Sequence, residues 1–228
     1  MSFLLPNRAT HLSERMDDPT CDAQRLHNTY QQFHLVNQFL SGWDRIYKVY
    51  LKPRLGFSSS VLDVGCGGGD VLRKLAAWTK RDGLNVSFTG IDPDARALEY
   101  TKLHPTPPNV QFYRATSKEI LEAGKKFDIV LSNHVLHHLQ NEEVYALCKD
   151  SEQLANTFAL HNDIRRSGLA YAGFSLTKLI FRKSFTTEDG LLSIRRSFTS
   201  GELQKVVPSQ WRVEAMIPYR NLLIYESR

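Results

Sequence analysis

The chain has 228 residues, of which 42% are hydrophobic and 23% are charged. This composition is typical of a globular protein with a sizeable core, and it excludes a disordered or fibrous chain. No apolar run approaches the roughly 18 residues that span a bilayer, and the run at residues 3–5 is too short for a signal peptide. The sequence therefore predicts one globular domain, with the cytoplasm as its expected location.

The net charge of +5 is unevenly distributed, because residues 164–228 hold 11 Lys and Arg against 5 Asp and Glu. A solvated face is the simplest explanation of this basic region, and an anionic substrate, a membrane surface and nucleic acid are the alternatives. The three cysteines, Cys21, Cys66 and Cys148, are far apart and form no paired spacing. They predict neither a disulfide framework nor a zinc site, and no metal is expected.

Two helices are predicted before residue 55. Asp22 can cap the first, whose apolar residues recur at spacings of three and four: Leu26, Tyr30, Phe33, Val36, Phe39 and Leu40. Ser41 and Gly42 end this stripe, and a second, shorter helix follows before Pro53.

From residue 61 onward, short apolar runs alternate with helical segments. Strands are predicted at residues 61–64, 86–91, 110–113, 127–131 and 157–160. This alternation indicates βαβ units and a parallel sheet that is covered on both faces. The last two strands, at residues 211–217 and 221–225, are separated by only three residues and predict a hairpin, so at least one strand runs antiparallel.

A glycine-rich loop after the first strand is the most informative motif. It reads Asp63-x-Gly65-x-Gly67-x-Gly69, and Asp70 opens the next helix. Glycines allow sharp turns and a close approach of a ligand to the backbone. The dinucleotide motif G-x-G-x-x-G would need Gly or Ala at position 70, and Asp63 would repel a pyrophosphate but attract an ammonium group. The loop therefore predicts a ligand that is positively charged nearby.

Asp92 ends the second strand, where a carboxylate can accept hydrogen bonds from both hydroxyls of a ribose. The alternative is a helix N-cap, because Pro93 suits the first position of a helix.

These motifs together resemble the class I S-adenosylmethionine-dependent methyltransferases. The matching segments are residues 61–69, 89–92, 127–133 and 135–139, in the expected order. The resemblance implies a three-layer, Rossmann-like α/β fold with a seven-stranded, mostly parallel sheet and an antiparallel terminal hairpin strand. It also implies S-adenosylmethionine as the cofactor and S-adenosylhomocysteine as the product.

The resemblance assigns cofactor contacts to ten positions. Asp63 and the loop would hold the methionine end, Asp92 the ribose, and Ser132 with Asn133 and His134 would line the region of the methyl group. The full set of cofactor-binding positions is Asp63, Gly65, Cys66, Gly67, Asp92, Pro93, Ala115, Thr116, Ser132 and Asn133. The family often has an acidic residue for the adenine amino group where this chain has Thr116, a weaker acceptor.

The substrate is expected to be a small hydrophobic molecule. Methyltransferases that act on nucleic-acid bases or amide nitrogens typically carry Asn/Asp-Pro-Pro-aromatic after the fourth strand, whereas this chain has Ser132-Asn133-His134-Val135. Residues 135–139 resemble the small-molecule branch, including quinone-biosynthesis enzymes, and residues 162–167 resemble methyltransferases linked to polyketide products. O-methylation of a phenolic or enolic hydroxyl is the leading interpretation. The alternatives are C-methylation of a quinol-like ring, a non-catalytic cofactor-binding module, and an RNA methyltransferase.

Methyl transfer requires alignment above all, so a general base is optional. His161 is the first candidate because it ends the fifth strand at the carboxyl edge of the sheet, with Asp163 in support and His134 as the second candidate. His137 and His138 belong to the family-typical stretch and are expected to be structural.

The expected organisation is a single domain. Residues 1–55 form an N-terminal helical lid, 56–163 the cofactor-binding core, 164–210 an apolar and basic helical insertion, and 211–228 the terminal hairpin. The apolar stretch at 169–181 could roof the substrate pocket, or pack as ordinary core, and its basic flanks permit weak membrane-surface contact. The oligomeric state is not predicted.

Overall fold

The computed structural model describes residues 5–227, without the side chains of residues 33–39 and Leu179. The predicted apolar residues Phe33, Val36 and Phe39 therefore lie outside the described side chains. Asp22 caps the first helix, as predicted, because its carboxylate accepts a 2.7 Å hydrogen bond from the backbone N–H of Arg25.

A seven-stranded sheet in the order β3-β2-β1-β4-β5-β7-β6 forms the centre of the described chain. Its strands are β1 (Ser58–Val64), β2 (Asn85–Asp92), β3 (Val110–Arg114), β4 (Phe127–Asn133), β5 (Ala155–Ile164), β6 (Arg212–Met216) and β7 (Arg220–Glu226). The first five are parallel, and β7 pairs antiparallel with both β5 and β6. The predicted fold class, including the antiparallel terminal hairpin, is confirmed.

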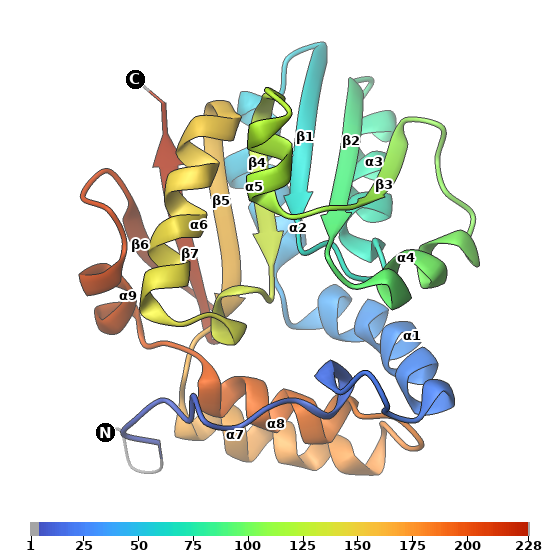
Figure 1. The fold of residues 1–228 in the computed structure, drawn as a ribbon, viewed down its shortest axis with the longest axis vertical. Helices are drawn as coiled ribbons and strands as arrows, with labels where there is room; N and C mark the ends of the chain where they lie inside the picture. Colours follow the sequence, from blue (N-terminus) through green and yellow to red (C-terminus); the bar gives the residue numbers. More distant parts are fainter. Residues whose placement is uncertain (1–4, 228) are drawn as a thin grey trace.

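Helices cover both faces of this sheet (Figure 1). One face packs against α2 (Trp43–Ile46), the π-helical turn Tyr47–Leu51 and α3 (Asp70–Arg81). The other packs against α6 (Asn141–Leu154) and α9 (Ser200–Val206), with α5 (Ser117–Glu122) beside α6. Side chains alternate between these two layers along each buried strand. This alternation decides which polar residues at the strand ends can reach a pocket.

A third group of segments lies across the carboxyl ends of the parallel strands (Figure 1). It contains α1 (Ala23–Phe39), α7 (Gly168–Ser175), the 3-10 turn Leu176–Leu179 and α8 (Thr186–Arg196). The N-terminal segment runs along α8, because the backbone N–H groups of Arg15 and Met16 both donate to the Asp189 carboxylate, at 2.7 and 3.0 Å. We call residues 14–17 the N-terminal strap. The N-terminal residues that were expected to form a lid thus lie in the same group of segments as α7 and α8.

Several predicted boundaries differ from the structure by a few residues, and two of these differences affect the site. The fifth strand was predicted at residues 157–160, but β5 continues to Ile164 because His161, Asn162 and Asp163 are buried and find polar partners inside the sheet. The helix after β2, α4 (Ala95–Lys102), begins two residues later than expected, and Asp94 rather than Asp92 is its N-cap. The side chain of Asp92 is therefore not used as a helix cap.

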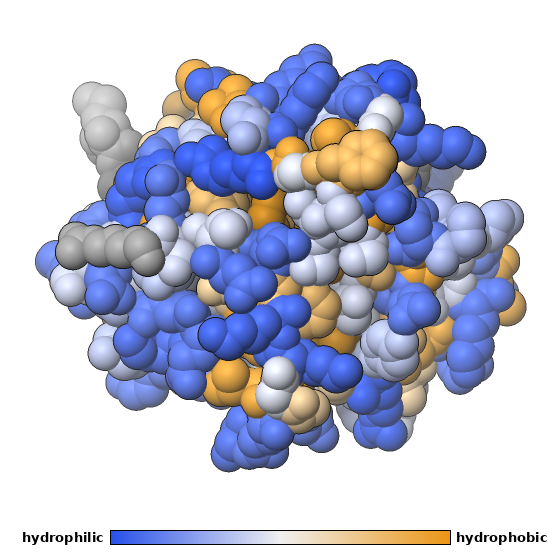
Figure 2. All heavy atoms as spheres, turned by 90° about the horizontal axis from the view of Figure 1, so that it is seen from above, coloured by the Kyte–Doolittle hydropathy of each residue, from blue (hydrophilic) through white to orange (hydrophobic). Residues whose placement is uncertain are grey.

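The face of the molecule at the amino ends of the parallel strands is mostly hydrophilic, with small scattered hydrophobic groups (Figure 2). Among the described residues, no helix combines the length and apolar character that crossing a bilayer requires.

Candidate active site

A pocket of about 670 Å³ lies between the carboxyl ends of the strands and the segments that cover them. This volume is within the usual range for small-molecule sites, and open α/β sheets bind their ligands at this edge. The glycine-rich loop and the ends of β1 and β2 line one end, and α7, α8 and the β6–β7 turn line the other.

The glycine-rich loop presents its backbone to the first end. Gly65 and Gly67 have φ values of 71° and 51°, in the left-handed region that glycine tolerates best. A Cβ added at Gly67 would meet no atom within 4 Å, so this position borders open space. The backbone N–H groups of Gly65 and Cys66 donate to the carbonyl of Ile91, at 2.8 and 3.0 Å, which fixes the loop against the end of β2.

Asp63 is a buried carboxylate that lines the pocket, and among the described residues neither of its oxygens has a hydrogen-bond partner. Its side chain is at the end of β1, and the residue is 1% exposed. Burial, with Asp70 and Asp92 nearby, raises the pKa of Asp63 well above its usual value. A buried carboxylate without a partner is unfavourable, and a cationic ligand in the pocket would satisfy it. This observation fits the α-ammonium group of S-adenosylmethionine, as the sequence predicts.

Asp92 lies beside the same loop. Its two oxygens accept hydrogen bonds of 2.9 Å from the backbone N–H groups of Gly67 and Asp94. A carboxylate has about four lone-pair sites, so two remain for a ligand in the pocket that Asp92 and Pro93 line. The residue therefore shapes the loop and can still accept from a ribose.

The positions predicted near the adenine do not line the pocket. Thr116 is the N-cap of α5: its hydroxyl accepts from the backbone N–H of Glu119 and donates to the Glu119 carboxylate at 2.8 Å. A hydroxyl used in both directions has little capacity left for adenine. Neither Thr116 nor Ala115 is among the lining residues, whereas Met16 and Asp17 of the N-terminal strap are.

His161 and Ser132 also lie away from the pocket. They are neighbours on adjacent strands, and both face the helical layer that contains α6. The His161 ring is fully buried, bonds Ser132 Oγ at 2.8 Å and Ser151 Oγ at 3.1 Å, and stacks on Trp211. Burial lowers the pKa of His161 to about 3. The structure therefore speaks against His161 as the general base.

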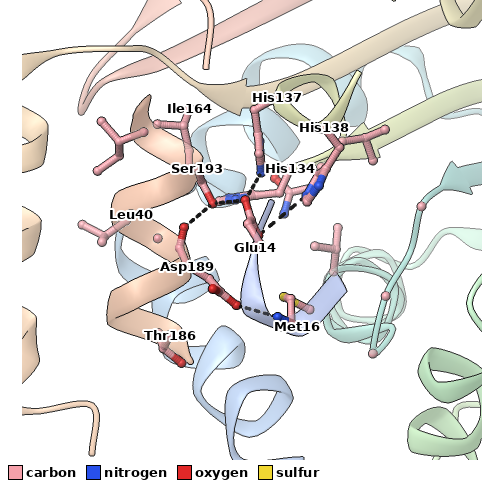
Figure 3. A pocket seen from close by; sticks show the side chains of 18 of the residues that line it. Glu14, Met16, Leu40, His134, His137, His138, Ile164, Thr186, Asp189 and Ser193 are labelled. Carbon is pink, nitrogen blue, oxygen red and sulfur yellow. Dashed lines mark hydrogen bonds and ion pairs between the residues drawn. The ribbon is translucent and has the colours of Figure 1, made fainter. Parts of the chain in front are cut away.

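Asp163 contacts His137 rather than His161. Its carboxylate accepts from His137 Nδ1 at 2.7 Å and from the His137 backbone N–H at 2.8 Å. His137 Nε2 lies 3.3 Å from a carboxylate oxygen of Glu14, which also accepts from Ser193 Oγ at 2.7 Å. Figure 3 shows Glu14 entering this cluster from the N-terminal strap, with Asp189 holding the strap at Met16. The sequence analysis missed Glu14.

The Glu14–His137–Asp163 chain is ionic. Burial alone would lower the pKa of His137, but Asp163 and Glu14 outweigh it and raise the pKa to about 9. Burial alone would raise the pKa values of both carboxyls, and His137 lowers them instead. Atoms of Glu14, His137 and His138 lie close enough together to hold a metal ion. His137 Nε2 would have to release its proton before it could bind a metal there.

The other end of the pocket is mostly apolar. Its lining includes Leu40, Ile164, Leu169, Ala170, Phe174, Ile194, Pro218 and Tyr219. Its polar lining side chains include His134, from the end of β4, and Arg220, from the start of β7. Arg220 Nη1 lies 3.0 Å from His134 Nε2. Asn133, which also lines the pocket, accepts from Arg220 Nη2 at 3.3 Å.

The strand order, the glycine-rich loop after β1 and the carboxylate at the end of β2 define the Rossmann-like architecture of the class I methyltransferases. Residues 61–156 match the family model described as a methyltransferase domain. The chain thus contains a methyltransferase domain of the S-adenosylmethionine-dependent class, and the resemblance stated from the sequence is confirmed.

The similar proteins are methyltransferases by name. The ubiquinone biosynthesis O-methyltransferase of Brucella ovis is 35% identical over 86 residues, which cover 37% of this chain and 32% of that protein. The match thus spans about a third of that relative's length. An O-methyltransferase family protein from Burkholderia thailandensis has a TM-score of 0.63 at 17% identity, over 94% of this chain and 61% of that one. The plantazolicin methyltransferase BpumL, solved with SAH, has a TM-score of 0.57 at 15% identity, over 90% and 88%. These two structures show the shared fold.

Proposed function

We propose that this chain transfers the methyl group of S-adenosylmethionine to an oxygen of a small hydrophobic molecule. The observation that carries the proposal is the unpartnered carboxylate of Asp63, which shares one pocket with Gly67, Asp92 and an apolar chamber. The names of the curated relatives, which are O-methyltransferases of ubiquinone biosynthesis, support oxygen as the acceptor.

The residues along the pocket have different roles. Asp63 binds the α-ammonium group of the cofactor, the backbone around Gly67 approaches its methionine end, and Asp92 accepts from the ribose. The bound cofactor supplies an electrophilic methyl group on a sulfonium. The apolar chamber holds the acceptor molecule and excludes water, so that its oxygen is aligned with the methyl group. Met16 and Asp17 close the pocket from the strap.

The activity is tested by incubating the purified chain with S-adenosylmethionine labelled in the methyl group and a panel of alkylated phenols, pyrones and quinols. Label in an extractable product, with a methoxy signal in its NMR spectrum, supports O-methylation. A ring methyl signal would favour the alternative of C-methylation. Cofactor binding without turnover on any acceptor would favour the non-catalytic module, and steeply salt-dependent RNA affinity would favour the RNA methyltransferase.

Weak contact with a membrane surface is a second property that the structure favours. Leu169, Leu176 and Ile180, on α7 and the segment after it, are 74%, 70% and 71% exposed, and Leu169 also lines the pocket. Exposed apolar side chains on the segments that cover a pocket for a hydrophobic substrate suit contact with a bilayer. Co-sedimentation with phosphatidylglycerol vesicles tests this: binding that Leu176→Ser with Ile180→Ser abolishes supports it, and equal binding of the variant contradicts it.

A further inference from the structure

Arg220 is a buried cation at the substrate end of the pocket. It is 3% exposed and starts β7 at the edge of the sheet where the pocket opens. Its Nε donates to the side-chain oxygen of Asn162 at 2.9 Å, Nη2 to that of Asn133 at 3.3 Å, and Nη1 to His134 Nε2 at 3.0 Å. A guanidinium has five N–H groups, so two remain beyond these three hydrogen bonds.

Arg220 has no carboxylate as an ion-pair partner among the residues that the structure describes. The other buried arginines in that part of the chain do: Arg166 pairs with Glu202 at 2.6 Å, and Arg196 lies 3.8 Å from Asp17. Burial lowers the pKa of Arg220 to about 10, and nearby Asp163 offsets only part of this effect. A buried charge without a partner is costly, and an anion in the pocket would remove that cost.

Asp163 does not fill this role. Its two oxygens are held by the His137 ring and by the backbone N–H groups of His137 and Ile164. His137 lies between Asp163 and Glu14, and among the described residues no hydrogen bond or ion pair joins Asp163 to Arg220. The positive charge of Arg220 is therefore left to face the pocket.

His134 presents a donor at the same place. Its Nε2 accepts from Arg220, so the hydrogen of the neutral ring is on Nδ1, for which the described residues provide no hydrogen-bond partner. Burial and the charge of Arg220 lower the pKa of His134 well below its usual value, which keeps the ring neutral. His134 follows β4, beside the region where the sequence places the methyl group. It is a hydrogen-bond donor here, and the earlier interpretation as a base does not fit this contact.

We propose that Arg220 and His134 bind the acceptor oxygen of the substrate as a phenolate or enolate anion. This inference rests on the proposed function and specifies its substrate class: a hydrophobic molecule with an acidic hydroxyl. The hydroxyl proton leaves to solvent when the anion forms. A lone pair of the anionic oxygen then forms the O–C bond as the C–S bond breaks, and the bonding electrons stay on sulfur as a neutral thioether. Anion and sulfonium give two neutral products, so no general base is needed in the transfer step.

The test uses 4-nitrophenol, whose phenolate is coloured, and uncharged 4-nitroanisole as a probe of the same shape. Both are titrated into the full chain saturated with S-adenosylhomocysteine, across the pH range in which the free phenol ionises. The expected result is a bound phenol that ionises at least one pH unit below the free phenol, a tenfold preference for the anion. The charged groups that bear on this site are Arg220, Asp163, His137 and His138.

Arg220→Gln should remove this preference and leave binding of 4-nitroanisole within about twofold, whereas Arg220→Lys should keep most of it. Arg212→Gln, at an exposed arginine of the neighbouring strand β6, is the control and should behave as the wild type. A wild-type complex that ionises the phenol no more readily than water does, or an Arg220→Gln variant that keeps the preference, would overturn the inference. Calorimetry with S-adenosylhomocysteine on the same samples separates the two proposals: absent cofactor binding contradicts the proposed function, whereas intact binding without anion preference contradicts this inference alone.

Discussion

Replacing Asp63 by asparagine should make the cofactor-free protein more stable and its cofactor binding weaker. The side chains have nearly the same shape, but asparagine carries no charge, and the part of the chain that the structure describes offers the carboxylate no partner. Leaving a buried polar group unsatisfied costs about 1–3 kcal/mol, and more when the group is charged. For a chain of this size, 1 kcal/mol corresponds to about 2–4 °C in Tm. Asparagine would itself be an unsatisfied polar group, so the substitution removes only the extra cost of the charge. With about 1 kcal/mol for that cost, we expect the Tm of Asp63→Asn to rise by about 2–4 °C without cofactor at neutral pH.

The same substitution replaces the charged acceptor of the ammonium group by a neutral amide oxygen. Hydrogen bonds to charged groups contribute about 1.5–3 kcal/mol, which corresponds to a roughly ten- to hundredfold loss of affinity. The raised pKa of Asp63 also fixes the direction in which the stability of the wild type changes with pH. The pKa of Asp63 is raised in the folded state, and an unfolded aspartate ionises near pH 4. The stability of the wild type should therefore fall as the pH rises above about 4 and through the folded pKa, and Asp63→Asn should lack this loss.

Thermal unfolding with and without S-adenosylhomocysteine measures both effects. Asp44→Asn is the matched control, because it removes one carboxylate that is 67% exposed in a surface ion pair and should change Tm little. If Asp63→Asn unfolds earlier than the wild type without cofactor and still gains the full stabilisation from S-adenosylhomocysteine, Asp63 has a structural role and the reasoning fails.

Three further predictions concern other parts of the site. Asp92→Asn should weaken S-adenosylhomocysteine binding at least tenfold in calorimetry, because one of its two backbone contacts is also lost; unchanged affinity would contradict the ribose assignment. His161→Asn should lower Tm, because packing and hydrogen bonds are lost, but should leave kcat per folded molecule within about twofold. A hundredfold loss of kcat would instead indicate that His161 acts as a base. The pKa of His137 is about 9 in the folded state and about 6.5 in the unfolded state. The protonated ring therefore stabilises the fold by about 3 kcal/mol below pH 6.5, and this stabilisation is lost as the pH rises through 9. Tm measured from pH 6.5 to 9.5 should fall accordingly in the wild type, and a His137→Asn variant with the same slope would contradict the ionic network.

The cofactor end of the pocket was largely predictable from the sequence. Glycine spacing and the carboxylates Asp63 and Asp92 are local signals, because strand, loop and helix follow one another directly along the chain. The role of Thr116 was also readable: Thr116-Ser117-Lys118-Glu119 is a capping-box sequence, and the structure uses it as one. Thr116 was instead assigned to adenine binding, because it stands where the family often has an acidic residue for the adenine amino group.

The substrate end was not predictable in the same way. Glu14 reaches His137 across 123 positions of sequence, and no periodicity or short motif connects them. Arg220 was read only as part of the hairpin turn, because its lack of a counter-ion is visible only once its neighbours are placed. His161 was misjudged because a residue at the correct edge of the sheet can still face the helical layer, and the side is set by the register of β5 against β4.

Titration calorimetry of the purified chain with S-adenosylmethionine and S-adenosylhomocysteine tests the central claim most directly. The account predicts saturable binding of both compounds at one site per chain, and a loss of about tenfold or more in Asp63→Asn with no loss in Asp44→Asn. Absence of heat with either compound, or equal affinity in wild type and Asp63→Asn, would contradict the assignment of this pocket as the cofactor site.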